Sequence, residues 1–175
     1  MKHILNNHCM HTLYCTLILP YLNYACEIWG NTFETRLNKV VILQKRAIRL
    51  VENVNYRDHT EPIFHKYKCL KFLDIISLKT LLVIYQAEKH ILPVNLQKLF
   101  MKTRNVHNHN TRSSNRGNFD LKFCRTKIRS MSISIRGVKL WNELNSNYHN
   151  IKSLSSFKKT IKKMYINGYN ANIQP

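Results

Sequence analysis

The sequence predicts a mainly α-helical protein in which a helical bundle is followed by a small basic α+β tail. Apolar residues between positions 33 and 97 recur at the three- and four-residue spacing of helices. From residue 119 to 135 they alternate instead with polar residues, which is typical of β-strands. Residues 1–97 carry 12 Lys or Arg and 7 acids, whereas residues 98–175 carry 16 and 2. We therefore expect a helical domain over 1–100, a polar linker over 101–117 and a basic tail over 118–175.

The helical domain is expected to begin with two long helices. The first covers residues 10–29, bends near Pro20 and stops at Gly30-Asn31, because proline removes a backbone donor and glycine favours helix ends. The second covers residues 33–52, with most of its basic side chains off the apolar face. That face consists of Leu37, Val40, Val41, Ala47, Ile48 and Val51.

Two further helices complete the expected domain. Thr60-Glu61-Pro62 is typical of a helix N-terminus and opens a short helix that reaches Lys68. Residues 73–92 predict a longer helix that is apolar on nearly all sides, as in helices packed between others. Pro93 ends it, and a short turn follows over 96–100.

The tail follows a polar segment over 101–118 that predicts a loop. Two strands are expected over 119–123 and 131–135, because Phe119, Leu121 and Phe123, and then Met131, Ile133 and Ile135, alternate with polar residues. They form the expected two-stranded β element. A short helix over 138–144 and a closing helix over 153–165 follow. The closing helix is expected to bury Leu154, Phe157, Ile161 and Tyr165 and to expose Lys159, Lys162 and Lys163.

The composition points to a folded protein with a polyanionic partner. The net charge is +19 and the pI is about 10, while 44% of the residues are hydrophobic, which argues against a disordered basic tail. Nucleic acid is favoured over the alternative that the charge only solvates the surface. Five cysteines without a C-x-x-C pair favour a reducing compartment. The apolar stretch over 13–22 is too short for a bilayer, which needs about 20 apolar residues, so we expect no membrane partner.

Catalytic motifs are missing from the sequence. It contains no G-x-x-x-x-G-K-[ST], G-x-G-x-x-G or G-x-S-x-G motif and only three aspartates. Two-metal phosphoryl transfer needs converging carboxylates, which nine scattered acids do not offer. We expect no enzyme activity, no catalytic residue and no cofactor. A metal site built from His3, His8, Cys9 and His11 is a weaker alternative, because the paired spacing of zinc modules is absent.

A basic cluster in the tail supplies the candidate binding site. Guanidinium groups bind phosphate oxygens bidentately, whereas nothing in this segment reads bases, so we expect salt-dependent binding to the RNA or DNA backbone. Phe119, Phe123 and Trp141 lie among these residues, and we expect them in the small core rather than against bases. The candidate contacts are Arg112, Arg116, Arg125, Lys127, Arg129, Arg136 and Lys139.

Four segments in series carry a family resemblance. Residues 13–24 (LYCTLILPYLNY), followed by IWGN over 28–31, resemble the segment just after the polymerase palm in non-LTR retrotransposon reverse transcriptases of the jockey-like, LINE type. Residues 43–49 (LQKRAIR) are similar to a helix of the same region. Residues 107–112 (HNHNTR) and 135–142 (IRGVKLWN) are similar to the family's late H-x-x-x-T-R and G-x-K-x-W-N motifs. The order and spacing hold over about residues 10–165.

The resemblance implies a C-terminal, thumb-like fragment of an RNA-directed DNA polymerase from a mobile element, which binds template or primer. The family's catalytic Tyr/Phe-x-Asp-Asp motif has no counterpart here, so no catalytic residue carries over. The implied location is intracellular and nuclear, because such an element acts on chromosomal DNA. The alternative is a protein-interaction remnant that docked on the missing palm through Leu13, Leu17, Tyr21 and Trp29.

Overall fold

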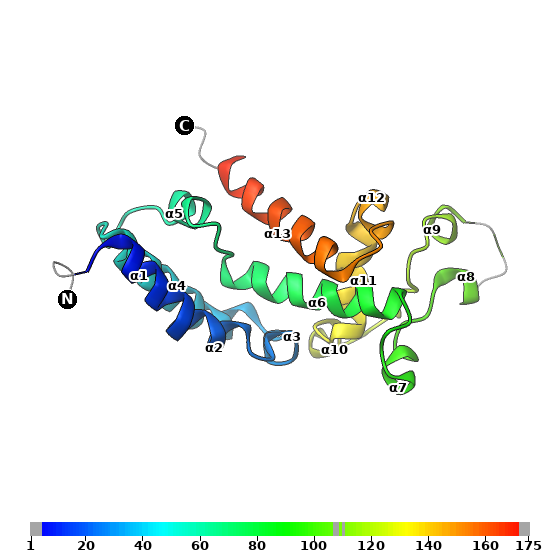
Figure 1. Cartoon of the computed structure of the whole chain (residues 1–175). Helices are drawn as coiled ribbons and strands as arrows, with labels where there is room; N and C mark the ends of the chain where they lie inside the picture. Colours follow the sequence, from blue (N-terminus) through cyan, green and yellow to red (C-terminus); the bar gives the residue numbers. More distant parts are fainter. Residues whose placement is uncertain (1–4, 107–108, 110, 172–175) are drawn as a thin grey trace. The chain divides into compact units, whose positions relative to one another are not determined.

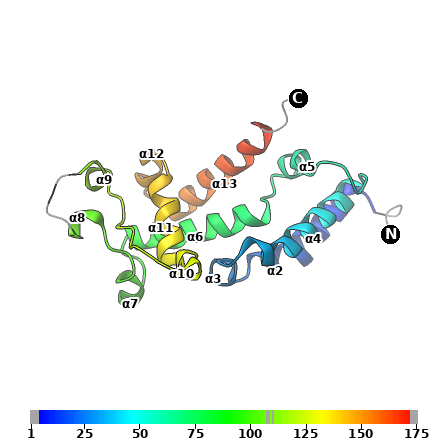
Figure 2. The same ribbon diagram turned by 180° about the vertical axis from the view of Figure 1, so that it is seen from behind.

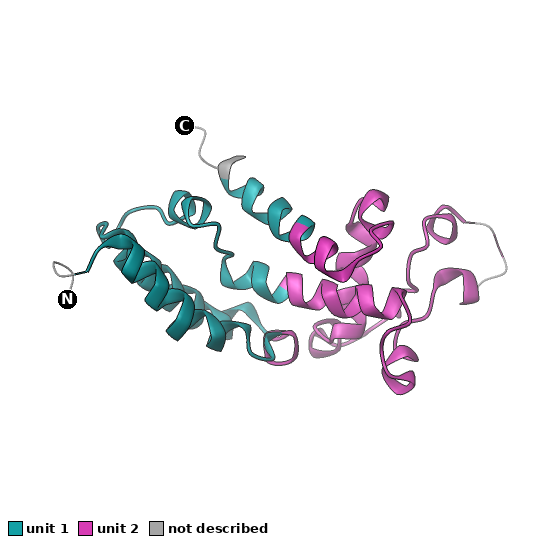
Figure 3. Cartoon of the chain, viewed as in Figure 1, with its two compact units in different colours: residues 1–26, 33–76, 160–175 teal, residues 27–32, 77–159 magenta. Residues whose placement is uncertain are grey.

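A computed structural model of the chain describes residues 5–106, 109 and 111–171. This part is mainly helical and contains no β-strand (Figure 1). The chain divides into two compact units (Figure 3): unit 1 comprises residues 1–26, 33–76 and 160–175, and unit 2 comprises residues 27–32 and 77–159. The expected mainly α class is confirmed, whereas the division into 1–100, 101–117 and 118–175 stays a prediction.

The predicted first helix is a chain of shorter segments. These are α1 (Asn7–Leu13), the π-helical η1 (Tyr14–Ile18), α2 (Leu19–Asn23) and α3 (Cys26–Trp29). The N–H of Leu19 donates to the carbonyl of Tyr14, five residues back, immediately before Pro20. Proline cannot continue the regular ladder, and the wider π-turn accommodates it. Ala25, with a φ of 46°, then separates α2 from α3.

The second predicted helix is confirmed as α4 (Glu34–Glu52), which ends at the left-handed Asn53. Helices α1 and α4 lie side by side within unit 1 (Figures 1 and 2). Leu37, Ile48 and Val51 are buried as expected, and Gln44 is buried among them. The short helix α5 (Glu61–Lys66) follows, as the Thr-Glu-Pro signal predicts.

The long apolar helix is α6 (Phe72–Glu88), whose residues contribute to the cores of both units. Phe72 and Ile76 are fully buried in unit 1, and Ile84 and Tyr85 are buried in unit 2, in keeping with a helix that is apolar on nearly all sides. The helix ends before the predicted Leu92. His90 is left-handed, and the N–H of Ile91 donates to the carbonyl of Gln86 at 2.9 Å.

The polar segment is a folded loop in unit 2 rather than a featureless linker. It follows α7 (Val94–Gln97) and contains α8 (Thr103–Val106) and α9 (Arg112–Asn115); residues 107, 108 and 110 of the HNHNTR motif lie outside the described residues. An isolated antiparallel bridge between Lys102 and Phe119 joins its ends. The N–H of Asp120 donates to the carbonyl of Met101 at 2.7 Å.

The predicted two-stranded β element is wrong. Residues 119–123 pair only at the Phe119 bridge, and the second predicted strand enters α11 (Ile133–Glu143), after α10 (Lys127–Ser130). Ile135, Val138 and Trp141 recur every three residues, so the second apolar run also fits a helix, and the helical fit buries all three. Phe123 is 85% exposed, so the first alternation does not mark a buried face.

The C-terminal elements are α12 (Ser146–His149) and α13 (Leu154–Ala171), which runs beyond the predicted end at 165. Phe157 and Ile161 are fully buried, and the three lysines expected to face outward are exposed. In unit 2, Phe157 stacks on Tyr85 with 4.6 Å between ring centroids, and Trp141 stacks on His149 at 4.5 Å. In the described ranges, no helix combines the length and the apolar composition that crossing a bilayer requires.

Candidate nucleic-acid interface

The seven predicted phosphate contacts all belong to unit 2. Six of the side chains are exposed and that of Arg136 is half-buried. They lie on short segments: Arg112 and Arg116 on and just after α9, Arg125 before α10, Lys127 and Arg129 on α10, Arg136 and Lys139 on α11. We call these residues the tail basic set.

The charge of the tail basic set is not neutralised within the described part of the chain. The ion pairs found there are Lys66–Glu52, Lys71–Glu61 and Lys102–Glu88, and none involves a member of the set. Asp120 is the only acid between positions 111 and 140. Cations that have no internal counter-ion stay available for phosphate, and their repulsion is relieved when a polyanion binds.

Side-chain caps open the two short helices, α9 and α10, that carry three of the seven cations and flank two more. The hydroxyl of Thr111 accepts a hydrogen bond from the N–H of Ser114 at 3.2 Å and opens α9. The hydroxyl of Thr126 accepts from the N–H of Arg129 at 3.3 Å and opens α10. Because each cap satisfies a backbone donor in the first turn, helices this short form and hold their basic side chains in solvent.

The G-x-K-x-W-N motif separates into packing residues and one solvent-facing cation. A Cβ on Gly137 would lie 2.9 Å from Cδ1 of Ile84 and 3.1 Å from Cγ2 of Thr80, so α11 approaches α6 closely only with glycine. Trp141 is fully buried. The amide of Asn142 donates to the carbonyl of Phe119 at 2.9 Å and accepts from its N–H at 3.0 Å. Lys139, between them, is exposed.

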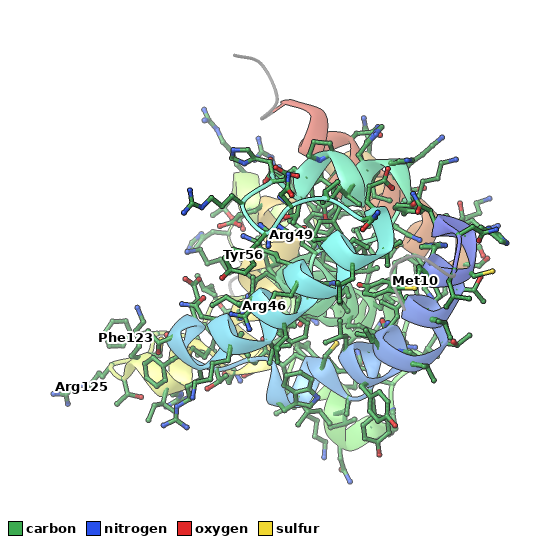
Figure 4. All side chains as sticks on the ribbon, turned by 90° about the vertical axis from the view of Figure 1, so that its left-hand side faces the viewer. Met10, Arg46, Arg49, Tyr56, Phe123 and Arg125 are labelled. Atoms are coloured by element: carbon green, nitrogen blue, oxygen red, sulfur yellow. The ribbon has the colours of Figure 1, made fainter. Side chains whose placement is uncertain are left out.

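Phe123 is the aromatic residue that the core prediction placed wrongly. Phe119 and Trp141 are buried, as expected, but Phe123 is 85% exposed. Figure 4 shows Phe123 and Arg125 projecting in the same direction, away from the ribbon of their own segment. An exposed ring next to an arginine can stack on an unpaired base while the guanidinium contacts the neighbouring phosphate.

A second basic site lies in unit 1 and was missed by sequence reasoning. The guanidinium carbons of Arg46 and Arg49 each lie 5.7 Å from the ring centroid of Tyr56, which is 67% exposed (Figure 4). Nε of Arg49 donates to the carbonyl of Asp58 at 2.9 Å, which fixes that side chain. A cavity of about 400 Å³, the arginine–tyrosine pocket, opens here, lined by Arg46, Arg49, Leu50, Val54 and Tyr56.

The signal for this pocket in the sequence is weak. Arg46 and Arg49 lie one helical turn apart within LQKRAIR and read only as the solvent side of an amphipathic helix. Tyr56 follows the helix in a polar loop, and only the left-handed turn at Asn53 brings it back against α4. Cations over an aromatic face and an open apolar wall suit a planar, negatively charged ligand.

A larger cavity in unit 1, of about 410 Å³, is lined by the half-buried acid Asp74 and by Lys71 and Tyr169. The hydroxyl of Tyr169 donates to Asp74 and accepts from the N–H of Lys71 at 3.0 Å. Burial raises the pKa of Asp74, and the pKa of Tyr169 is raised by burial and by the carboxylate beside it. The carboxylate is therefore tied to the hydroxyl of Tyr169.

Comparison with protein-family models, curated proteins and solved structures finds no match for this chain.

Proposed function

We propose that the chain is a non-catalytic, nucleic-acid-binding C-terminal part of a LINE-type RNA-directed DNA polymerase, and that it binds template or primer by the phosphate backbone. The observation that supports this most is the tail basic set: seven cations on and beside the helices α9, α10 and α11 of unit 2, without internal counter-ions among the described residues. Phosphate contacts of this kind position a strand without reading its sequence.

The exposed aromatic residues favour strands that present unpaired bases. Phe123 lies beside the tail basic set, and Tyr56 forms one wall of the arginine–tyrosine pocket. Stacking on such rings contributes about 1–3 kcal/mol per base and tolerates any sequence. In duplex nucleic acid the base faces are covered by their neighbours, so we propose that single-stranded RNA binds more tightly than duplex DNA.

The carboxylates support a non-catalytic role. Glu52, Glu61 and Glu88 are held in ion pairs with lysines, and Asp74 is held by a tyrosine hydroxyl. Metal-dependent polymerisation needs carboxylates that converge on two ions about 4 Å apart. Among the described residues, the potential metal ligands that lie close together are His11, Cys15 and Cys69, and this group contains no carboxylate.

The test is binding of the purified chain to single-stranded RNA, duplex DNA and an RNA–DNA hybrid at a series of salt concentrations. With 6–10 phosphate contacts, affinity is expected to fall by roughly 10³–10⁵ between 50 and 200 mM salt. Arg125→Ala/Lys127→Ala/Arg129→Ala is expected to weaken binding to all three. Binding that is absent, or that does not respond to salt, would contradict the proposal.

A second candidate function, docking on the polymerase palm, is supported by an exposed apolar stripe in unit 1. Leu13, Leu17 and Tyr21 lie on successive turns of α1, η1 and α2, and Leu17 and Tyr21 are 61% and 79% exposed. Trp29, the fourth predicted residue, belongs to unit 2 and is 40% exposed. A stripe of this kind would drive self-association once its partner is missing.

Sedimentation at low salt without RNA tests this second function. Concentration-dependent oligomers that Leu17→Ser/Tyr21→Ser abolishes would favour docking. A monomer that binds RNA would favour the first proposal.

A further inference from the structure

Two cysteine thiols in unit 1 converge on one histidine nitrogen. Sγ of Cys15 lies 3.4 Å from Nε2 of His11, and Sγ of Cys69 lies 3.6 Å from the same nitrogen. All three atoms lie within 4.8 Å of one another. Cys69 is buried, whereas His11 and Cys15 are half-buried, so the cluster is reached from solvent on one side.

The fold brings these groups together from distant parts of the chain. His11 and Cys15 are one helical turn apart across the junction of α1 and η1, and the i, i+4 spacing places two ligands on one helix face. Cys69 follows Lys68, whose φ of 50° turns the chain between α5 and α6. The ring of Tyr67 stacks on that of His11 at 4.7 Å and holds the imidazole in place.

Hydrogen bonding does not account for this arrangement. Nε2 of an imidazole carries either one lone pair or one hydrogen, so it forms one good hydrogen bond, not two. A single cation between the three atoms would satisfy all of them. Zinc–ligand lengths of about 2.0–2.1 Å to nitrogen and 2.3 Å to sulfur place tetrahedral N and S ligands about 3.5–3.6 Å apart. The separations of 3.4 and 3.6 Å agree with that value.

We propose that His11, Cys15 and Cys69 bind one Zn²⁺ ion through Nε2 and the two sulfurs. The donor set selects zinc over Mg²⁺ and Ca²⁺, which prefer oxygen. In the part of the chain that the structure describes, no fourth histidine, cysteine or carboxylate joins the group, so the fourth tetrahedral position is open to water or an external ligand.

Binding is an exchange of protons for metal and needs no oxidant. Each thiol gives its proton to solvent and its sulfur bonds to zinc, so two thiolates neutralise the ion. Burial raises the pKa of the Cys69 thiol to about 11, and coordination deprotonates such a thiol outright. The ion would join the α1–η1 segment to the α5–α6 connection and so stabilise unit 1.

This site differs from the metal alternative in the sequence. That alternative joined His11 to His3, His8 and Cys9; His3 lies outside the described residues, and His8 and Cys9 are exposed on α1. The zinc proposal uses different residues from the nucleic-acid proposal, so each can be tested independently of the other.

Cobalt substitution tests the site on the reduced, chelator-treated full chain. Titration with Co²⁺ is expected to give the visible bands of tetrahedral cobalt and a thiolate-to-cobalt charge-transfer band, saturating at one ion per chain. Zn²⁺ should then abolish both bands by displacing cobalt and should raise the melting temperature of the metal-free protein.

Two variants and one control make the test specific. Cys15→Ser is expected to lose the charge-transfer band or reduce it to the intensity of one thiolate, and His11→Asn, which keeps both thiolates, is expected to weaken cobalt binding. The metal-free melting temperature shows that both variants fold. Cys9→Ser removes an exposed thiol from the same helix and should leave the titration unchanged. An absent cobalt spectrum, or an unchanged spectrum in Cys15→Ser, would overturn the proposal.

Discussion

The side-chain amide of Gln44 donates a hydrogen bond to the hydroxyl of Tyr14 at 3.0 Å, and both side chains are buried. The same amide nitrogen donates to the carbonyl of Leu70 at 3.0 Å, and its oxygen accepts from the N–H of Phe72 at 2.7 Å. Burial raises the pKa of Tyr14 to about 12, so its hydroxyl stays neutral. Residues 13–24 and 43–49, two of the segments that carry the family resemblance, therefore meet at one polar centre in unit 1.

Gln44→Leu is expected to destabilise the protein by about 3 kcal/mol, because it leaves a hydroxyl, a carbonyl and an N–H buried without partners. Urea unfolding followed by circular dichroism measures the effect. Lys45→Ala, at the next and exposed position of α4, should change stability by less than about 0.5 kcal/mol. Equal effects of the two substitutions would show that the polar centre at Gln44 does not contribute to the stability of the protein.

Gly137→Ala is expected to destabilise by about 1–3 kcal/mol, because the added methyl overlaps Ile84 and Thr80 in a packed core. Gly168→Ala is the matched control: this glycine also lies in a helix, but no atom would lie within 4 Å of its Cβ. Alanine there should stabilise by about 0.5–1 kcal/mol through helix propensity. Thermal unfolding of both variants should therefore show shifts of opposite sign.

Glu52 makes stability depend on pH. The hydrogen bond from Lys66, and then that from Tyr67, lower the pKa of Glu52 below its usual 4.5. Because the folded-state value is the lower one, this stabilisation is complete above the unfolded pKa and is lost as the pH falls through the folded pKa. Glu52→Gln should lose about 1 kcal/mol at pH 7, a small effect because Lys66 is largely exposed. In unfolding titrations the difference from wild type should vanish at acidic pH, and a difference that persists there would contradict the assignment.

Tyr56→Leu should weaken binding to single-stranded RNA by about 1–3 kcal/mol if a base stacks in the arginine–tyrosine pocket. Duplex DNA, whose bases are already stacked, should bind the variant as it binds the wild type. Tyr21→Leu removes a ring from α2 that is even more exposed than that of Tyr56 and serves as the control. Fluorescence anisotropy compares the three proteins, and parallel losses for RNA and duplex would exclude stacking.

Helical spacing of apolar residues predicted α4, which buries one face, and α6, which is apolar on nearly all sides. Helix α4 follows the spacing of Leu37, Ile48 and Val51. The long helix α6 follows the apolar residues from Phe72 to Tyr85. Alternation failed over 131–135, where a short apolar run fits two periods and packing of α11 on α6 decides for a helix, and over 119–123, where Phe123 is exposed. The end of α6 depends on a left-handed histidine, which the residues alone do not indicate.

The candidate sites also differ in whether the sequence alone reveals them. The tail basic set could be named from the sequence, because uncompensated charge is a property of composition, and the structure leaves six of the seven side chains exposed. The arginine–tyrosine pocket and the His11–Cys15–Cys69 cluster could not, because each joins a helix to a residue that a left-handed turn brings back. Such convergence depends on single backbone angles that no local pattern encodes.

The salt dependence of single-stranded RNA binding tests the central claim most directly. For single strands, each phosphate contact contributes about 0.7 to the slope of log affinity against log salt. Arg125→Ala/Lys127→Ala/Arg129→Ala should therefore lower that slope by about 2, whereas Lys158→Ala/Lys159→Ala/Lys163→Ala, three exposed cations of α13, should leave it nearly unchanged. If the two triple variants lower the slope equally, or neither does, the tail basic set is not the binding surface.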